Sequence, residues 1–241
     1  MSLWLHELAE ADHRILNPFS DEKLMRLGAV SRVGAGTTVL DLACGKGEML
    51  CRWAQEYGTA GHGVDLSEVF LEAARARAAE LGVEVGFSHS DAADYRPSTR
   101  YDVVSCLGAT WIGDGLTGTI RLLREAVTRD GLLLVGEPYW IDPPPDEARA
   151  ALGPGEYTGL GGVLDTFTGA GVELVEMLLS NGDEWDRYAA AQWWTLTEWL
   201  RAHALSDPRA AEVREFRDES RRIHLSYFRR YLGWGVFVLR P

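Results

Sequence analysis

The segment VLDLACGKGEM, residues 39–49, joins a short apolar run to two closely spaced glycines and the start of an amphipathic stretch. Residues 37–42 are β-branched and apolar, which predicts a strand, and residues 48–57 have the pattern of a helix. Gly45 and Gly47 allow the connecting loop to approach a ligand closely with its backbone. This unit of strand, glycine loop and helix predicts a ligand site at the carboxyl end of a parallel strand.

The same alternation of strand and helix continues along the chain. Further apolar runs predict strands at residues 61–66, 83–89, 101–109, 131–137, 172–179 and 233–240. Helical patterns occupy segments between them, at residues 67–82, 116–128 and 160–169, and another helical pattern begins after Ser20, ahead of the first strand. Strands that are apolar on both faces and alternate with helices indicate an α/β fold, with a mainly parallel sheet covered on both sides.

The length of 241 residues and the hydrophobic content of 46% are typical of one soluble α/β domain with an insertion. Residues 183–230 are helical in pattern and rich in Trp, and Asp207-Pro208 divides them into two helices. We expect a single domain made of an N-terminal arm, a ligand-binding core, a helical cap and a last strand, at residues 1–19, 20–180, 181–232 and 233–241.

The charge balance and the cysteines exclude several classes of protein. With 24 Lys and Arg against 36 Asp and Glu, the net charge is −12, which repels nucleic acid and anionic membranes. Three cysteines without a CxxC pair encode neither a disulfide framework nor a zinc site, and the histidine spacing suggests no metal. No uninterrupted apolar run approaches the length of about 18 residues that a membrane-spanning helix needs. We expect a soluble, cytoplasmic protein without a bound metal.

Three successive predicted strands end in a carboxylate, at Asp41, Asp65 and Asp91. Asp65 follows Asp41 by 24 residues, and a carboxylate at the tip of the second strand can accept hydrogen bonds from both hydroxyls of a ribose. Asp91 could accept a hydrogen bond from the exocyclic amine of an adenine. Helix capping together with Ser67 remains the alternative for Asp65, and a turn the alternative for Asp91.

Two other nucleotide motifs fit the spacing less well. A P-loop requires a glycine where Leu40 stands and a Ser or Thr directly after Lys46, where the chain has Gly47. A dinucleotide loop of the NAD type requires a third glycine, and that position is Leu50. These departures exclude a Walker motif and make an NAD-dependent oxidoreductase the weaker hypothesis.

The sequence DLACGKG resembles motif I of the class I S-adenosylmethionine-dependent methyltransferases, with Ala43 in place of the first glycine of the usual pattern. GVDLS is similar to the ribose-binding strand of that family and SDAAD to its adenine-binding loop. Over nearly the whole chain, five further segments resemble the bacterial YjhP-like methyltransferases, namely HRILNPFSDEK, GATWI, GEPYW, EWDRY and YLGWGVF.

The resemblance implies a doubly wound, Rossmann-like sheet of seven strands, with an antiparallel last strand and a helical cap inserted before it. It implies S-adenosyl-L-methionine as cofactor, bound by Asp41, Ala43, Cys44, Gly45, Gly47, Asp65, Leu66, Asp91, Ala92 and Gly108. The expected function is methyl transfer to a small-molecule acceptor. A protein that binds S-adenosylmethionine without catalysis, such as a sensor or an accessory subunit, is the alternative. The resemblance does not supply the acceptor or the oligomeric state.

Methyl transfer requires a positioned acceptor and, for some acceptors, the removal of a proton. Glu137 ends the predicted strand at 131–137, Tyr139 follows it, and His13 belongs to the N-terminal arm, so all three are candidates for this role. A purely structural role is at least as plausible for each. We also expect residues 5–19 to close over the site together with the cap, with His13 and Arg14 facing inward.

The cap carries five large aromatic residues, at 185, 188, 193, 194 and 199. A Trp stripe on a helix is more often part of a core than of a ligand surface. Together with Trp111 and Trp140 at strand ends, these rings could instead line an apolar cavity for the acceptor.

Overall fold

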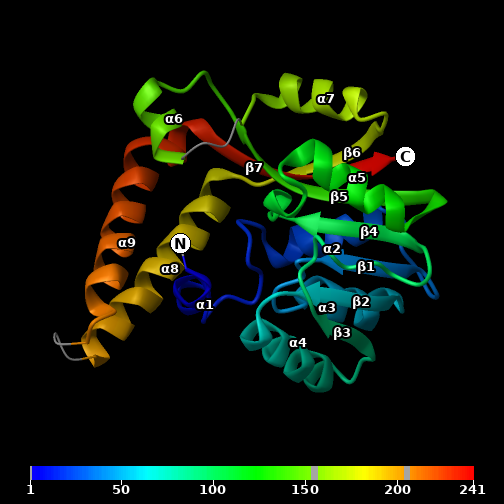
Figure 1. Ribbon diagram of the computed structural model, residues 1–241, viewed down its shortest axis with the longest axis horizontal. Coiled ribbons are helices and arrows are strands. Elements are labelled where there is room, and N and C mark those ends of the chain that lie inside the picture. Colours follow the sequence, from blue (N-terminus) through cyan, green and yellow to red (C-terminus); the bar gives the residue numbers. More distant parts are fainter. Residues whose placement is uncertain (1, 153–156, 204–206) are drawn as a thin grey trace.

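The computed structural model describes residues 2–152, 157–203 and 207–241, and its centre is a seven-stranded sheet of order β3-β2-β1-β4-β5-β7-β6 (Figure 1). Strands β1 to β5 pair in parallel, and β7 is antiparallel to both of its neighbours, β5 and β6. This confirms the predicted doubly wound sheet with an antiparallel last strand. The strands are β1 (Thr38–Leu42), β2 (Ala60–Asp65), β3 (Val85–His89), β4 (Tyr101–Leu107), β5 (Val127–Trp140), β6 (Glu173–Leu179) and β7 (Leu232–Arg240).

Helices cover both faces of the sheet (Figure 1). One face packs on α5 (Leu116–Ala126) and α7 (Leu160–Gly169), through apolar side chains such as Leu123 and Phe167. The other face packs on two helices whose residues include Leu27 and Trp53, namely α2 (Asp21–Val30) and α3 (Glu48–Tyr57). Helix α4 (Glu68–Leu81) packs beside α3. The central parallel strands β1, β4 and β5 are therefore buried on both faces, which explains their continuous apolar runs.

The cap is a pair of long helices, α8 (Gly182–Ala202) and α9 (Ala210–Ile223), on the side of the sheet to which β4 points (Figure 1). A π-helical turn (His224–Phe228) and the short α10 (Arg229–Tyr231) connect α9 to β7. At the N-terminus, α1 (Leu3–Ala9) packs on both cap helices, where Leu5 meets Leu196 of α8 and Val213 of α9. The arm and the cap thus share a small apolar core.

The largest differences from the sequence-based expectation concern the boundaries of β5. The helix expected at 116–128 ends at Ala126, because β-branched Val127 begins the strand. The strand also continues past 137 to Trp140, because β7 pairs with it along its whole carboxyl-terminal half. Glu137 and Tyr139 therefore lie inside a strand and do not follow it. A short helix, α6 (Asp146–Leu152), comes after this strand.

The amino-acid pattern did not predict α1, which forms the first half of the arm. Ser2 caps this helix by accepting a hydrogen bond from the backbone N–H of Leu5 at 3.3 Å. Among the described helices, none combines the length and the apolar character that a membrane crossing requires.

Candidate active site

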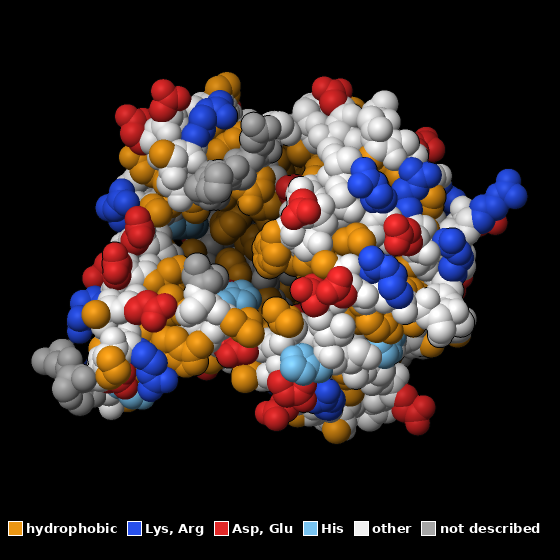
Figure 2. Space-filling model, in the orientation of Figure 1, with side chains coloured by type: hydrophobic (Ala, Val, Ile, Leu, Met, Phe, Trp, Pro, Cys, Tyr) orange, Lys and Arg blue, Asp and Glu red, His pale blue; other side chains and the backbone are white. Residues whose placement is uncertain are grey.

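A cavity of about 790 Å³ lies where the carboxyl ends of β1, β2 and β4 meet the arm and the cap. Figure 2 shows this hollow, with mainly hydrophobic side chains on its wall. Its position is the one at which open parallel sheets bind ligands, since the strand order reverses between β1 and β4. The wall contains nine of the ten residues predicted to bind cofactor: Asp41, Ala43, Cys44, Gly45, Asp65, Leu66, Asp91, Ala92 and Gly108.

The tenth residue, Gly47, shapes the loop and does not line the cavity. Its φ of 64° is left-handed, and a Cβ atom there would lie 2.7 Å from the ring of Phe87. Gly45 has a left-handed φ of 53°, and a Cβ atom there would likewise come too close to the side chain of Leu16 in the arm. Ala43 also adopts a left-handed φ, of 60°, which a non-glycine residue rarely does. Its methyl group therefore strains the loop without blocking it.

Asp65 is held rigidly at the end of β2. Its Oδ2 accepts a hydrogen bond from the backbone N–H of Gly45 at 2.7 Å, and its Oδ1 accepts one from Ser67 at 2.8 Å. Ser67 itself caps α4 by accepting a bond from the N–H of Phe70. The capping alternative therefore applies to Ser67, while the Asp65 carboxylate joins the second strand to the glycine loop. Each carboxylate oxygen retains a further lone pair for a ligand hydroxyl.

Asp41, at the end of β1, is buried and forms no ion pair with any of the described residues. Burial raises the pKa of this carboxyl to about 7, although Ser105 Oγ donates a hydrogen bond to Oδ1 at 2.7 Å, and the nearby Asp65 raises the pKa further. Burial, Asp41 and Asp65 also raise the pKa of the Cys44 thiol well above its usual value. The acidic end of the cavity therefore favours a positively charged ligand group, and the thiol stays protonated at neutral pH.

The third strand end and the loop after β4 complete this half of the cavity. Asp91 lies in a turn in which its Oδ1 accepts a bond from the N–H of Ala93 at 2.9 Å, so the turn alternative describes its local geometry. Its side chain is exposed at the rim, near Leu66, which is 55% exposed. A large apolar side chain at the mouth of a cavity offers a flat ligand ring a packing surface.

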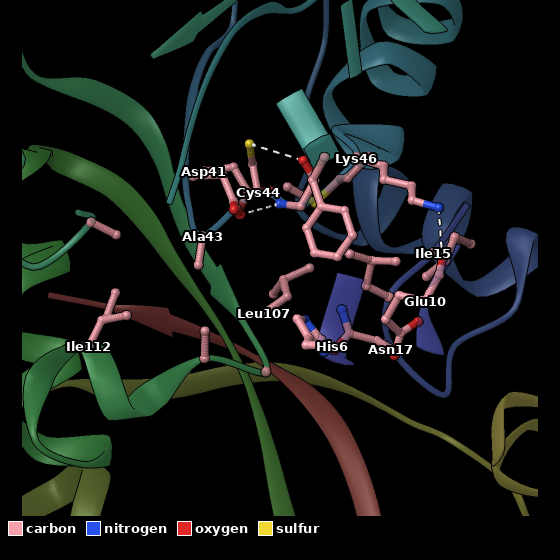
Figure 3. A pocket seen from close by; sticks show the side chains of 18 of the residues that line it. His6, Glu10, Ile15, Asn17, Asp41, Ala43, Cys44, Lys46, Leu107 and Ile112 are labelled. Atoms are coloured by element: carbon pink, nitrogen blue, oxygen red, sulfur yellow. Dashed lines mark hydrogen bonds between the residues drawn. The ribbon is translucent and has the colours of Figure 1, made fainter. Parts of the chain in front are cut away.

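Lys46 of the glycine loop binds the N-terminal arm. Its Nζ donates to the backbone carbonyls of Glu10, Ala11 and His13, at 2.7 Å each. Figure 3 shows Lys46 reaching toward Glu10, with Asp41, Ala43 and Cys44 on the opposite side of the cavity. The arm therefore sits directly on the loop that lines the cavity.

Glu10, at the end of α1, is fully buried between the arm and α8. Its Oε1 accepts hydrogen bonds from Tyr188 at 2.5 Å and Gln192 at 2.6 Å, and its Oε2 lies 2.9 Å from Nδ1 of His13. Burial raises the pKa of Glu10, but His13 and Tyr188 outweigh this and hold it below its usual value. Glu10 thereby fixes two of the three α8 side chains that line the cavity.

The arm only partly fulfils the expectation for its inward-facing residues. Arg14 is on the wall of the main cavity. His13 is not, and it lines a smaller pocket beside Lys46. The centroid of its ring lies 4.9 Å from that of Tyr188, so His13 packs against a side chain of the cavity wall without lining the cavity itself.

The half of the cavity opposite the acidic strand ends is mostly apolar and aromatic. Its wall comes from the arm, from α2, β5 and β7 and from the cap, and includes Leu16, Leu24, Pro138, Trp185, Phe216 and Trp234, with Asn17, Tyr188 and Gln192 as polar members. Of the five cap aromatics, Trp185 and Tyr188 lie on this wall. Trp193, Trp194 and Trp199 do not line it.

Glu137 and Tyr139 point away from the cavity. Side chains alternate along a strand, and Pro138, between them, is on the cavity wall beside its β7 partner Trp234. Glu137 is buried on the other face, where its Oε2 accepts a hydrogen bond from Thr110 Oγ1 at 2.7 Å. Tyr139 packs against Gly233. Neither side chain reaches the cavity, and Glu137 instead anchors the loop after β4.

The buried Glu137 carboxyl gives a pH-dependent prediction. Burial raises its pKa to about 7, against a partly opposing hydrogen bond from Thr110. Above about pH 4.5 the unfolded chain loses this proton while the folded protein keeps it, so the free energy of unfolding falls as the pH rises toward 7. Glu137→Gln should therefore gain on the order of 2 kcal/mol relative to the wild type between pH 4.5 and pH 7.5. Denaturant titrations across this range measure the difference. A constant difference would mean that the carboxyl is not protonated in the fold.

Several residues on the wall escaped the sequence analysis. Asn17 lies next to Gly108, and a Cβ atom on that glycine would come 2.4 Å from Asn17 Oδ1. No local sequence pattern indicates the role of Glu10, because its hydrogen-bond partners lie 178 and 182 residues away in the sequence. In the described parts of the chain, no group of three or more acidic, His or Cys residues could hold a metal ion.

Comparisons with known proteins agree with this geometry. Residues 39–131 match a family model described as a methyltransferase domain. The chain is 43% identical to YjhP of Escherichia coli strain K12 over 238 residues, which are 96% of both chains. The chain belongs to the YjhP-like family of S-adenosylmethionine-dependent methyltransferases.

Solved structures of this methyltransferase family extend the comparison to the fold. A methyltransferase from Geobacter sulfurreducens, in complex with S-adenosyl-L-homocysteine, is 44% identical and superposes with a TM-score of 0.95 over 100% of this chain and 98% of its own. A second, from Thiobacillus denitrificans and with the same ligand, is 42% identical, with a TM-score of 0.93 over 99% and 98% of the two chains.

Proposed function

We propose that this chain binds S-adenosylmethionine in the acidic half of the cavity and transfers its methyl group to a small-molecule acceptor in the apolar half. The observation that carries the proposal is the two-sided wall of one cavity. Asp41, Asp65 and Asp91 come from three neighbouring strands, and the arm and the cap face them with aromatic and apolar side chains. The family's S-adenosylhomocysteine complexes support the choice of cofactor.

The proposed roles of the acidic residues follow from their geometry. Asp65 would accept both ribose hydroxyls, since its carboxylate is fixed by Gly45 and Ser67. Asp91, at the rim beside Leu66, would bind the adenine amine. Asp41 would face the cationic end of the cofactor, whose positive charge stabilises the ionised carboxylate.

The chemistry left to the protein is mainly positioning. The lone pair of the acceptor attacks the methyl carbon, the bond from that carbon to sulfur breaks, and sulfur keeps the electron pair. The protein must therefore align the acceptor and exclude water. Pro138, Trp185 and Trp234 form an apolar surface for this purpose. A proton-removing role for Glu137, Tyr139 or His13 draws no support from their orientation, because none of the three lines this cavity.

The raised pKa of Asp41 predicts how cofactor affinity depends on pH. Below pH 7 the carboxyl is increasingly protonated in the free protein, and binding a cation must then release that proton. Between pH 7 and pH 5.5 the affinity for S-adenosylmethionine should therefore fall by roughly tenfold. Calorimetry at several pH values measures this, with Asp41→Asn as the variant whose affinity stays constant. An equally flat profile for the wild type would show that Asp41 does not face the cation.

A titration of the purified chain with S-adenosylhomocysteine and with NADH tests the choice of cofactor. We expect saturable binding of S-adenosylhomocysteine that Asp91→Ala weakens, and no binding of NADH. Selective binding of NADH would favour the oxidoreductase hypothesis and overturn the proposal.

A further inference from the structure

A second cavity, of about 350 Å³, lies between α8 and α9 and adjoins the main one. We call it the side cavity. Four side chains line both cavities, namely Trp185, Tyr188, Gln192 and Phe216. The rest of its wall is mainly apolar and consists of Ala151, Ala189, Ile223 and Phe228, with Glu219, Ser220 and His224. Because these four side chains border both cavities, the side cavity lies directly next to the main cavity.

His224 is a buried imidazole on the wall of the side cavity, and it is 3% exposed. Its Nε2 lies 2.8 Å from Oδ1 of Asp186, whose Oδ2 accepts a bond from Arg229 at 2.9 Å. These bonds from His224 and Arg229 hold the pKa of Asp186 below its usual value. An ionised carboxylate only accepts hydrogen bonds, so Nε2 carries the proton. In the neutral ring Nδ1 is then a hydrogen-bond acceptor.

The backbone around His224 is unusual as well. This residue begins the π-helical turn His224–Phe228, a conformation that is rare and that occurs mostly at functional sites. The ring centroid of His224 lies 6.3 Å from that of Trp185 and 5.6 Å from that of Trp193. The turn thus places the imidazole between two indole rings, at the junction of the cap with the strand that follows.

Trp185 supplies an independent observation. Its indole Nε1 is buried and, within the part of the chain that the structure describes, has no hydrogen-bond partner. Burial of an unpaired donor is unfavourable, so a ligand acceptor bonded to this N–H would stabilise the site. Trp193, in contrast, donates its N–H to Ser220 Oγ at 3.0 Å.

A hydroxyl matches these two side chains. Its oxygen can accept from the indole N–H of Trp185 while its hydrogen is donated to Nδ1 of His224. Two N···O distances of about 2.9 Å can join rings whose centroids are 6.3 Å apart. A carboxylate would offer no proton to His224, and an ammonium group would offer no lone pair to Trp185.

We propose that the side cavity binds the end of the methyl acceptor opposite the methylated atom, and that Trp185 and His224 recognise a hydroxyl group there. The acceptor is then a small molecule with an apolar body and a distal hydroxyl. This inference rests on the proposed function, because it extends the acceptor half of the same cavity.

The test uses the protein saturated with S-adenosylhomocysteine and three pairs of probes that differ only in a hydroxyl or a methyl group. The pairs are phenol and toluene, 2-naphthol and 2-methylnaphthalene, and 4-phenylphenol and 4-methylbiphenyl. Calorimetry or ligand-observed NMR gives the affinities. We expect at least one hydroxylated probe to bind about tenfold more tightly than its partner. Trp185→Phe, which removes the N–H donor and replaces the indole with a smaller aromatic ring, and His224→Phe should each reduce this preference to less than threefold.

His203→Phe is the matched control, since His203 is on the same cap but lines neither cavity. It should keep the full preference. The proposal is wrong if no pair shows a preference for the hydroxyl, or if the preference persists in Trp185→Phe. The affinity for S-adenosylhomocysteine, measured first in every variant, separates this from a failure of the proposed function. A chain that does not bind S-adenosylhomocysteine would refute the function itself, whereas intact binding without hydroxyl preference refutes only the side cavity's role.

Discussion

Asp65→Ala is expected to bind S-adenosylhomocysteine roughly 30- to 1000-fold more weakly than the wild type. The change removes a charged acceptor for the ribose hydroxyls, which corresponds to about 2 to 4 kcal/mol. It also removes the carboxylate that holds the N–H groups of Gly45 and Ser67, so the glycine loop loses a support on the same side of the cavity. Calorimetry measures the affinity, and a denaturant titration establishes that the variant is folded.

Asp94→Ala is the control for this experiment. Asp94 is an exposed acid in the loop after β3 and does not line the cavity, so its loss changes the overall charge equally. We expect its affinity to stay within about twofold of the wild type, as usual for an exposed charge. A folded Asp65→Ala protein with undiminished affinity would remove Asp65 from the binding site.

The second large effect is expected from the N-terminal arm. A chain that begins at Ser20 lacks the Glu10 and Asn17 side chains of the cavity wall and the three carbonyls that bind Lys46. It should fold on the remaining sheet but bind S-adenosylhomocysteine at least about tenfold more weakly. In the full-length chain, hydrogen exchange of residues 5–19 should slow when this ligand is added, because a segment that covers a ligand gains protection.

Lys46→Met tests the contact between Lys46 and the arm in a chain that still contains the arm. It keeps an unbranched side chain that is one atom shorter but removes the three hydrogen bonds, so residues 5–19 should exchange faster even with ligand bound. Arg129→Met, at an exposed position outside the cavity wall, is the control for the lost charge. Equal exchange of the arm with and without ligand, together with full affinity of the shortened chain, would show that the arm serves only packing.

The sequence allowed prediction of the parts of the fold that depend on local patterns. The strand ending at Asp41, the glycine loop and the helix after it are contiguous, so their spacing alone indicated a ligand site. The acids at 65 and 91 could be predicted for the same reason, since parallel strands end at one edge of a sheet. Resemblance to a family added the number of strands and the antiparallel direction of the last one, which periodicity does not reveal.

The remaining features depend on contacts between distant segments. The orientation of Glu137 follows from pairing with Gly235 of β7, which a sequence pattern around 137 does not contain. The burial of Glu10 against α8 and the hydrogen bonds from Lys46 to the arm likewise join residues that are far apart in the chain. The π-helical turn at His224 could not be predicted either, because an amphipathic helix pattern continues through it.

Transfer of a labelled methyl group tests the central claim most directly. The purified chain is incubated with S-adenosylmethionine carrying a labelled methyl and with a pool of small metabolites extracted from bacteria. We expect labelled small molecules to form together with an equal amount of S-adenosylhomocysteine, and we expect Asp65→Ala to form neither product. S-adenosylmethionine that binds but keeps its label in every pool tested would contradict methyl transfer and would identify the chain as a binding protein without catalysis.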